Sequence, residues 1–256
     1  MSVSPRSQVR NPTPNASLHK AAQAFIHESL IARYSYGFEW LGRPIIQYPQ
    51  DIMAIQELVW ATRPDLIIET GVAHGGSLIL SASLLALLDM CDAIDHGTPF
   101  DPRQSSRCVL GIDVDIRSHN RDAIEAHPLA SRIDLIQGSS ISGDTISIVR
   151  KRAKEFANVM VLLDSNHTHD HVLTELYAYA PLVTLGNYCV VFDTIIEDVP
   201  ATMFPNRPWG PGNNPKTAVA EFLSHCPDFT IDKDVDNKLS VSVAPDGYLK
   251  RVCNQG

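Results

Sequence analysis

Three histidines and two carboxylates crowd into the segment 164-DSNHTHDH-171, directly after the apolar run 158-NVMVLLD-164. Side chains of these types do two kinds of chemistry in proteins, because they bind metal ions and they move protons as general bases. The segment therefore permits three interpretations. It is a zinc cluster, a general base beside a metal ion, or a polar turn without a chemical role.

The zinc interpretation rests on HTHDH, which is similar to the HxHxDH box of metallo-β-lactamase-like hydrolases. The spacing is one residue too short, and His225 is the only histidine downstream of the segment. A zinc site also needs at least three ligands in the right geometry. A zinc hydrolase is therefore kept only as an alternative.

The elements around this segment predict how it is positioned. Five short apolar runs cover 65-DLIIET-70, 108-CVLGIDVD-115, 133-IDLIQG-138, 158-NVMVLLD-164 and 188-YCVVFD-193. The helices expected between them cover about 76–91, 117–126, 142–156 and 168–181. β-Branched runs that alternate with helices are typical of a parallel sheet with helices on both faces. We therefore expect an α/β fold.

Segments on either side complete the expected organisation. The expected elements are helices over about 17–34 and 50–63, an extended segment over 43–51, a helix from Pro215 with Asn214 as N-cap, and a strand pair over 228–234 and 238–249. We expect residues 1–16 to be a flexible arm and residues 17–256 to form one domain. Its helical segment 17–63 is expected to cap the site.

Composition excludes several classes of protein. The net charge of −8 and the lack of a basic block argue against a nucleic-acid partner. Five scattered cysteines without CxxC spacing are typical of reduced thiols, and we expect a cytoplasmic protein. The most apolar helix, 77-SLILSASLLALLDM-90, is short and serine-rich, so no membrane span is expected.

Polar residues gather where the expected strands end. In an open α/β sheet, ligands bind beyond the carboxyl ends of the strands. The candidates at these ends are Glu69, Gly71, Asp113, Ser139, Asp164 and Asp193. The glycines of 69-ETGVAHGGSLI-79 permit a tight turn and a close ligand, although neither GxGxxG nor GK[ST] appears. Asp113 is placed to accept hydrogen bonds from a ribose diol.

In this order and spacing the chain resembles the S-adenosylmethionine-dependent methyltransferases of the Rossmann-like class. Within them it resembles the cephalosporin hydroxylase-like family, which includes rhamnosyl and macrolide-sugar O-methyltransferases. The matching pieces are 47-QYPQDI-52, 67-IIETGVAHGGS-77, 111-GIDVDIR-117, 138-GSS-140, 163-LDSNHTHDHV-172, 190-VVFDT-194 and 245-PDGYLKR-251. The resemblance implies a mostly parallel seven-stranded sheet with helices on both faces and an antiparallel C-terminal hairpin.

The resemblance also implies a cofactor site and a metal site. The residues implied to bind S-adenosylmethionine are Glu69, Gly71, Gly75, Ser77, Asp113, Ser139, Ser140 and Asp164. Asp164 and Asp193 match two of the three positions that hold Mg²⁺ in metal-dependent members, and Phe192 stands at the third. Thr194, Glu197, water or substrate then supplies the remaining oxygen, since Mg²⁺ commonly keeps several waters.

His167 matches the general base of related sugar O-methyltransferases, which carry D-x-x-H at this place. A neutral imidazole can take the proton of a sugar hydroxyl while the oxygen attacks the methyl sulfonium. The alternative is a histidine that caps the following helix. His169 and His171 are expected at the surface or in supporting positions. Tyr48 and Trp209 are candidates for stacking on the substrate, although Trp209 could equally fasten its own loop.

The expectation is an S-adenosylmethionine-dependent, Mg²⁺-assisted O-methyltransferase that acts on a sugar hydroxyl of a glycan, glycolipid or natural product. Its catalytic residues would be His167 and Asp164. The alternative from another class is a non-catalytic cofactor-binding subunit of a β-lactam or natural-product tailoring system. Family resemblance also suggests a homo-oligomer.

Overall fold

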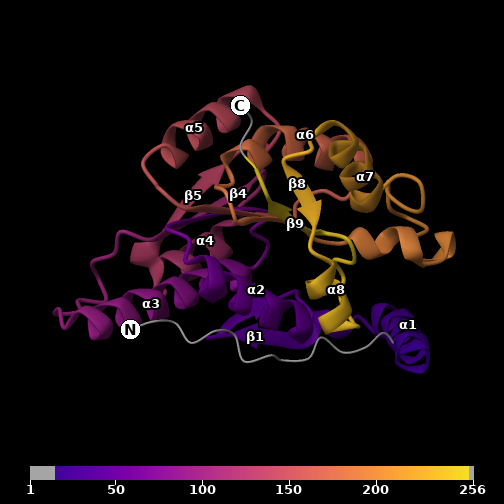
Figure 1. Cartoon of the computed structure of the whole chain (residues 1–256), viewed down its shortest axis with the longest axis horizontal. Helices are drawn as coiled ribbons and strands as arrows, with labels where there is room; N and C mark the ends of the chain where they lie inside the picture. Colours follow the sequence, from indigo (N-terminus) through magenta and orange to yellow (C-terminus); the bar gives the residue numbers. More distant parts are fainter. Residues whose placement is uncertain (1–14, 254–256) are drawn as a thin grey trace.

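The computed structural model describes residues 15–253. A seven-stranded sheet with the order β5-β4-β3-β6-β7-β9-β8 lies at its centre (Figure 1). Its strands are β3 (Leu66–Thr70), β4 (Cys108–Asp113), β5 (Ile133–Gln137), β6 (Val159–Leu163), β7 (Tyr188–Val191), β8 (Phe229–Ile231) and β9 (Tyr248–Arg251). Strands β3 to β7 run parallel, whereas β9 is antiparallel to both β7 and β8. The predicted fold class is confirmed.

Successive residues of the central strands point to opposite faces of the sheet, and each face has its own buried cluster. Ile67 shares one cluster with Leu85 of α3 (Gly76–His96), and α2 (Pro49–Thr62) lies on that side. Ile68 shares the other with Leu176 of α6 (His169–Tyr179), together with α5 (Gly143–Ala153) and α7 (Pro215–His225). Strands buried on both faces explain why these runs lack polar alternation.

The N-terminal segment differs from the expectation. Helix α1 (Ala16–Ile31) starts after Asn15, whose side chain accepts the backbone N–H groups of Ser17 and Leu18. It ends three residues before the predicted end. Strands β1 (Phe38–Trp40) and β2 (Arg43–Ile45) then form a separate antiparallel pair, where only an extended segment was expected. Residues 1–14 of the expected arm lie outside the described residues.

Helix α3 is longer than the predicted 76–91, because it continues to His96 and ends at Gly97 in the left-handed conformation. With this length it is the one helix of residues 15–253 that is long and apolar enough to cross a membrane. Ten of its residues are buried, among them Leu78, Ile79 and Leu85. These side chains form part of the core of the sheet. The next helix, α4 (Ser118–Glu125), follows β4.

The predicted strand over 238–249 is wrong in its first part. Helix α8 (Lys233–Leu239) precedes a loop, and strand β9 begins only at Tyr248. The alternating 239-LSVSV-243 does not pair with a strand because a buried carboxylate takes its polar groups. Asp51 accepts the Ser242 hydroxyl at 2.6 Å and the Val243 N–H at 3.0 Å.

The strand order creates a crevice. From β3 the chain moves to β4 and β5 on one side, and then β6 pairs with the opposite side of β3. The loops that leave β3 and β6 therefore diverge, which is the topological switch point where open α/β sheets bind ligands. Glu69 lies near the end of β3, Gly71 follows that strand, and Asp164 follows β6.

Candidate active site

A cavity of about 990 Å³ opens at this switch point. Its walls come from five places: residues 27–48, the glycine loop after β3, the turn after β6, the loop after β7, and Val243 in the loop before β9. This volume is at the upper end of the range for small-molecule sites. It can therefore hold a cofactor together with a second ligand.

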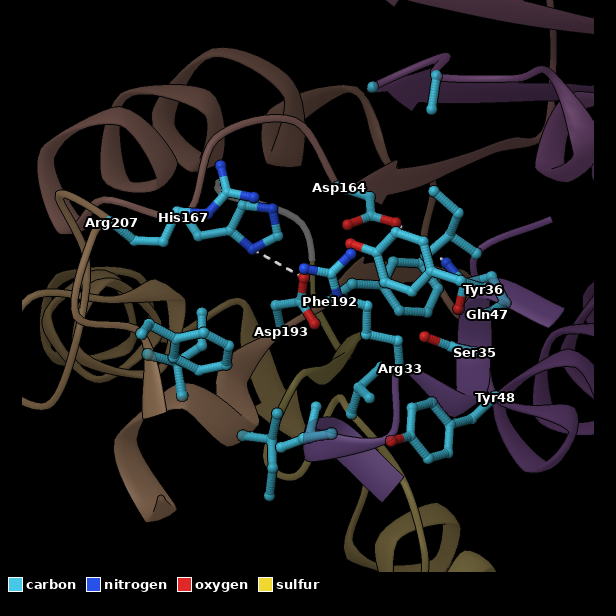
Figure 2. Close-up of a pocket in the computed structure, with 18 of the residues that line it drawn as sticks. Arg33, Ser35, Tyr36, Gln47, Tyr48, Asp164, His167, Phe192, Asp193 and Arg207 are labelled. Carbon is cyan, nitrogen blue, oxygen red and sulfur yellow. Dashed lines mark hydrogen bonds and ion pairs between the residues drawn. The ribbon is translucent and has the colours of Figure 1, made fainter. Parts of the chain in front are cut away.

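The strongest chemical feature of the cavity is a histidine–carboxylate pair. The Nδ1 atom of His167 lies 2.8 Å from Oδ2 of Asp193, as the dashed line in Figure 2 marks. The imidazole also stacks on Trp209, with a centroid distance of 4.9 Å and an angle of 29°. A carboxylate that accepts Nδ1–H fixes the ring orientation and leaves Nε2 as the acceptor. This geometry suits a general base.

The same pair forms part of a group that could hold a cation. Ligand atoms of Asp164, His167 and Asp193 all lie within 4.8 Å of one another. Two carboxylates fit a divalent cation that completes its shell with water. The Phe192 ring is buried beside them, and the Thr194 hydroxyl instead donates to the Pro245 carbonyl at 2.6 Å.

Acidic side chains near the ends of β3 and β6 share an electrostatic feature. Burial raises the pKa of Glu69 to about 7. Burial also raises the pKa of Asp164 well above its usual value, and the nearby charge of Asp193 adds to this shift. Oε2 of Glu69 is buried and has no hydrogen-bond partner among the described residues. Carboxylates held in this way favour a bound cation at the switch point.

Predicted cofactor residues fall into two groups. Gly71, Ser77 and Asp164 line the large cavity, and Ser77 also donates a hydrogen bond to Glu69. Glu69 lines a small adjoining cavity together with Ser77 and Asp164. Gly75 adopts the left-handed conformation that starts α3. Glu69, Gly71, Ser77 and Asp164 form the first group, and they meet at the switch point.

Asp113, Ser139 and Ser140 lie outside the cavity wall. Asp113 Oδ2 accepts the Val72 N–H at 2.8 Å, so this carboxylate fixes the glycine loop. The Ser140 hydroxyl lies 3.1 Å from His171 Nε2. The structure thus gives Asp113 and Ser140 partners within the protein.

The remaining histidines of the 164–171 segment turn away from His167. His169 contacts Thr217 at 2.8 Å and Glu221 at 3.1 Å, which joins α6 to α7. His171 lies against Ser140. The three imidazoles do not converge on one point, so the geometry gives the zinc alternative no support.

Two residues before α2 differ in their roles. Gln47 Nε2 donates to Asp164 Oδ2 at 3.0 Å, which holds that carboxylate in place. Tyr48 lines the cavity but is buried, and its hydroxyl lies 2.7 Å from the Ser29 hydroxyl. Trp209 lines the cavity in its stack with His167.

Two further residues of the cavity wall are not among the candidates named from the sequence. Arg33 follows α1, and Arg207 lies in the loop after β7. Arg33 stands inside the helix expected over about 17–34, and Arg207 belongs to no motif and to no periodic element. Their position became evident only once distant segments were placed around the same cavity.

Comparison with known proteins identifies the family. Residues 32–252 match the family model described as rhamnosyl O-methyltransferase/CmcI. The rhamnosyl O-methyltransferase of Mycobacterium bovis (strain BCG / Pasteur 1173P2) is 29% identical over 206 residues, which are 78% of this chain and 73% of that protein. The Mycobacterium leprae (strain TN) protein of the same name is 26% identical over 216 residues, with 83% and 82% covered.

A solved structure described as cmcI-D160 Mg-SAM has the same fold. It matches with a TM-score of 0.55 and 22% identity, and it covers 85% of this chain and 78% of its own. The family model covers most of the chain, and it agrees with the family that the motifs predicted. The chain therefore belongs to the rhamnosyl O-methyltransferase/CmcI family of S-adenosylmethionine-dependent O-methyltransferases.

Proposed function

We propose that this protein transfers the methyl group of S-adenosylmethionine to a hydroxyl of a sugar, with His167 as the general base. The observation that carries the proposal is the contact between His167 and Asp193 in the wall of a cavity at the switch point. Relatives named rhamnosyl O-methyltransferase support a sugar as the acceptor.

The cofactor would supply the electrophilic methyl group, and the protein would position the two reactants in line. The partnerless oxygen of buried Glu69 suits the ammonium group of the cofactor. Nε2 of His167 would accept the hydroxyl proton, and the carboxylate of Asp193 would stabilise the imidazolium that forms. Trp209 would keep the imidazole plane fixed through its stack.

Asp164 and Asp193 would hold Mg²⁺ if the reaction uses it. A bound cation would lower the pKa of the acceptor hydroxyl and orient it. A neighbour with the same fold is described with Mg and SAM, which supports this assignment. The buried Phe192 leaves two carboxylates from the chain, so we expect weak metal binding.

Calorimetry with S-adenosylmethionine tests the cofactor site. We expect micromolar binding to the wild type, and binding weakened by about tenfold or more in Glu69→Gln, since an amide removes the negative charge but keeps the shape. Titrations with Mg²⁺ and with a chelator show whether the metal contributes. A wild-type protein that binds no cofactor under either condition would contradict the proposal.

A non-catalytic cofactor-binding subunit remains the alternative function. It predicts cofactor binding without methyl transfer to any sugar. The oriented His167–Asp193 pair favours the enzyme, because a binding subunit has no use for a base aligned in this way. Homo-oligomerisation and a cytoplasmic location stay predictions.

A further inference from the structure

Two arginines face the cavity without an acidic partner. Among the described residues, Arg33, Arg117 and Arg207 are the arginines whose guanidinium makes no hydrogen bond or ion pair to a protein group. Arg33 and Arg207 both line the large cavity, and Arg117 does not. Unpaired surface arginines are common, but two that line one active-site cavity are a feature of that cavity.

These arginines come from opposite walls. Figure 2 shows Arg33 entering from the side of the N-terminal segment and Arg207 entering from the side of His167. The guanidinium of Arg207 lies 5.1 Å from the ring centroid of Trp209, and Trp209 in turn stacks on His167. Arg207 and His167 therefore both contact Trp209.

The backbone at Arg33 has an unusual conformation, which affects the direction of the Arg33 side chain. Its φ of 53° lies in the left-handed region, which a residue with a Cβ adopts at some cost in energy. The chain makes this turn directly after α1, between Leu30 and Tyr36, whose backbone groups hydrogen-bond to Arg33. The turn carries the Arg33 side chain to the cavity instead of along α1.

The charged side chains of the cavity wall leave the two arginines without a partner. The described Asp, Glu, Lys and Arg residues that line the cavity are Asp164, Asp193, Arg33 and Arg207. S-adenosylmethionine carries a sulfonium, an ammonium and a carboxylate, so it adds a net positive charge. Glu69 is assigned to the ammonium of the cofactor, and Asp164 and Asp193 are assigned to a metal ion. None of these carboxylates is then left to pair with the two guanidinium groups. A neutral acceptor would not supply a counter-charge.

We propose that the methyl acceptor is an anionic sugar, whose phosphate or carboxylate group is bound by Arg33 and Arg207. This rests on the function proposed above and names the class of its substrate. Guanidinium groups match the geometry of both anions and bind them with two parallel hydrogen bonds. The sugar ring would lie between this anion site and Nε2 of His167.

Calorimetric competition between chosen probes tests this proposal in the presence of excess S-adenosylhomocysteine. The probes are methyl rhamnoside as the neutral sugar, rhamnose 1-phosphate as the phosphate, methyl glucuronoside as the carboxylate, and inorganic phosphate as the bare anion. The variants are Arg33→Gln, Arg207→Gln and their double variant. Arg103→Gln is the control, since it removes the same charge from an exposed residue outside the cavity.

We expect one anionic sugar to bind at least about tenfold more tightly than methyl rhamnoside, and the stronger of the two identifies the anion. The preference should shrink in each single variant, disappear in the double variant and persist in the control. Equal affinity for neutral and anionic sugars would overturn the proposal. A preference that survives in the double variant, or inorganic phosphate binding as tightly as the sugar phosphate, would also overturn it.

Methyl transfer, measured separately with each sugar, distinguishes this proposal from the function on which it rests. Transfer to methyl rhamnoside and to both anionic sugars at equal kcat/KM would leave the function intact and overturn the anionic acceptor. An anion preference that depends on Arg33 and Arg207, without methyl transfer to any probe, would support the anion site and contradict the enzymatic function.

Discussion

Asp51 provides a test of the structure that is independent of catalysis. Its carboxylate is fully buried and joins helix α2 to the loop before β9. It accepts three hydrogen bonds, from the hydroxyls of Ser242 and Tyr248 at 2.6 Å each and from the Val243 N–H at 3.0 Å. Through α2 it also supports the segment that carries Gln47 to the site.

Two substitutions at Asp51 should differ strongly. Asp51→Ala leaves two buried donors and one half-buried donor without an acceptor, and each costs about 1–3 kcal/mol, so the free energy of unfolding should fall by about 3–9 kcal/mol. Asp51→Asn can keep all three contacts. Its carbonyl accepts the N–H of Val243, and its amide donates to the two hydroxyls, which rotate to accept. We expect it to cost about 1 kcal/mol or less at pH 5.

The contribution of Asp51 to stability depends on pH. Burial raises the pKa of Asp51 to about 6 in the folded protein, above its ordinary value of 3.8. The folded state therefore binds the proton more tightly than the unfolded state. This contribution to stability is complete at acidic pH and is lost as the pH rises through about 6. Asp51→Asn does not titrate, so from pH 5 to pH 8 it should gain about 1 kcal/mol relative to the wild type.

Urea unfolding at pH 5 and pH 8 measures both effects, with the m-value as a check that the unfolding stays two-state. Equal losses of stability in Asp51→Ala and Asp51→Asn would refute the reasoning from the three donors. A difference between wild type and Asp51→Asn that does not change with pH would refute the role assigned to burial.

Two further predictions concern packing and charge. Gly71→Ala would place its Cβ far inside van der Waals contact with the carbonyl oxygen of Asp164, at a φ of +92°, so the free energy of unfolding should fall by about 3 kcal/mol or more and cofactor binding should weaken. Gly97→Ala is the control, since its φ is +64° but its Cβ meets open space, and it should cost only about 1 kcal/mol. Equal losses in the two variants would contradict the steric argument. Asp89→Ala removes an ion-pair partner of Arg132, whose side chain is 1% exposed, so the free energy of unfolding should fall by about 3–5 kcal/mol in thermal unfolding. A change below about 0.5 kcal/mol would contradict the assigned pair.

The central sheet could be predicted from the sequence because its five parallel strands are short apolar runs, and four of them, β3, β4, β6 and β7, are buried on both faces. Each run is followed by a turn and a helix, so the periodicity changes where the element changes. The antiparallel order of β8 and β9 came from family resemblance. The pair β1–β2 was missed because strands of three residues with charged and proline side chains show no periodicity.

Helix α8 was missed for a different reason. The alternation in 239-LSVSV-243 is typical of a strand, but the tertiary structure engages Ser242 and Val243 with Asp51 instead. Asp51 could not be recognised from the sequence as a buried acceptor of three hydrogen bonds, since an acidic residue in the first turn of a helix is usually exposed. Local patterns do not reveal which distant loop a side chain will meet.

The sequence placed His167 and Asp193 at the ends of neighbouring strands, which is why they could be named as candidates. Their contact depends on the pairing of β6 with β7 and on the left-handed backbone of Asp193, with a φ of 56°. The role of Trp209 in stacking on His167 and the presence of Arg33 in the cavity depend on loops. Such loops show no periodicity from which their positions could be predicted.

The transfer of a labelled methyl group under single-turnover conditions tests the central claim most directly. The wild type and His167→Ala are each loaded with labelled S-adenosylmethionine and mixed with methyl rhamnoside, rhamnose 1-phosphate or methyl glucuronoside, while calorimetry measures cofactor binding. The account predicts methyl transfer by the wild type and a rate lower by about 10²–10⁴ in the variant, because a lost base has an effect of this size. Cofactor affinity should stay nearly unchanged. Equal rates in both proteins, or no transfer by a wild type that binds the cofactor, would contradict it.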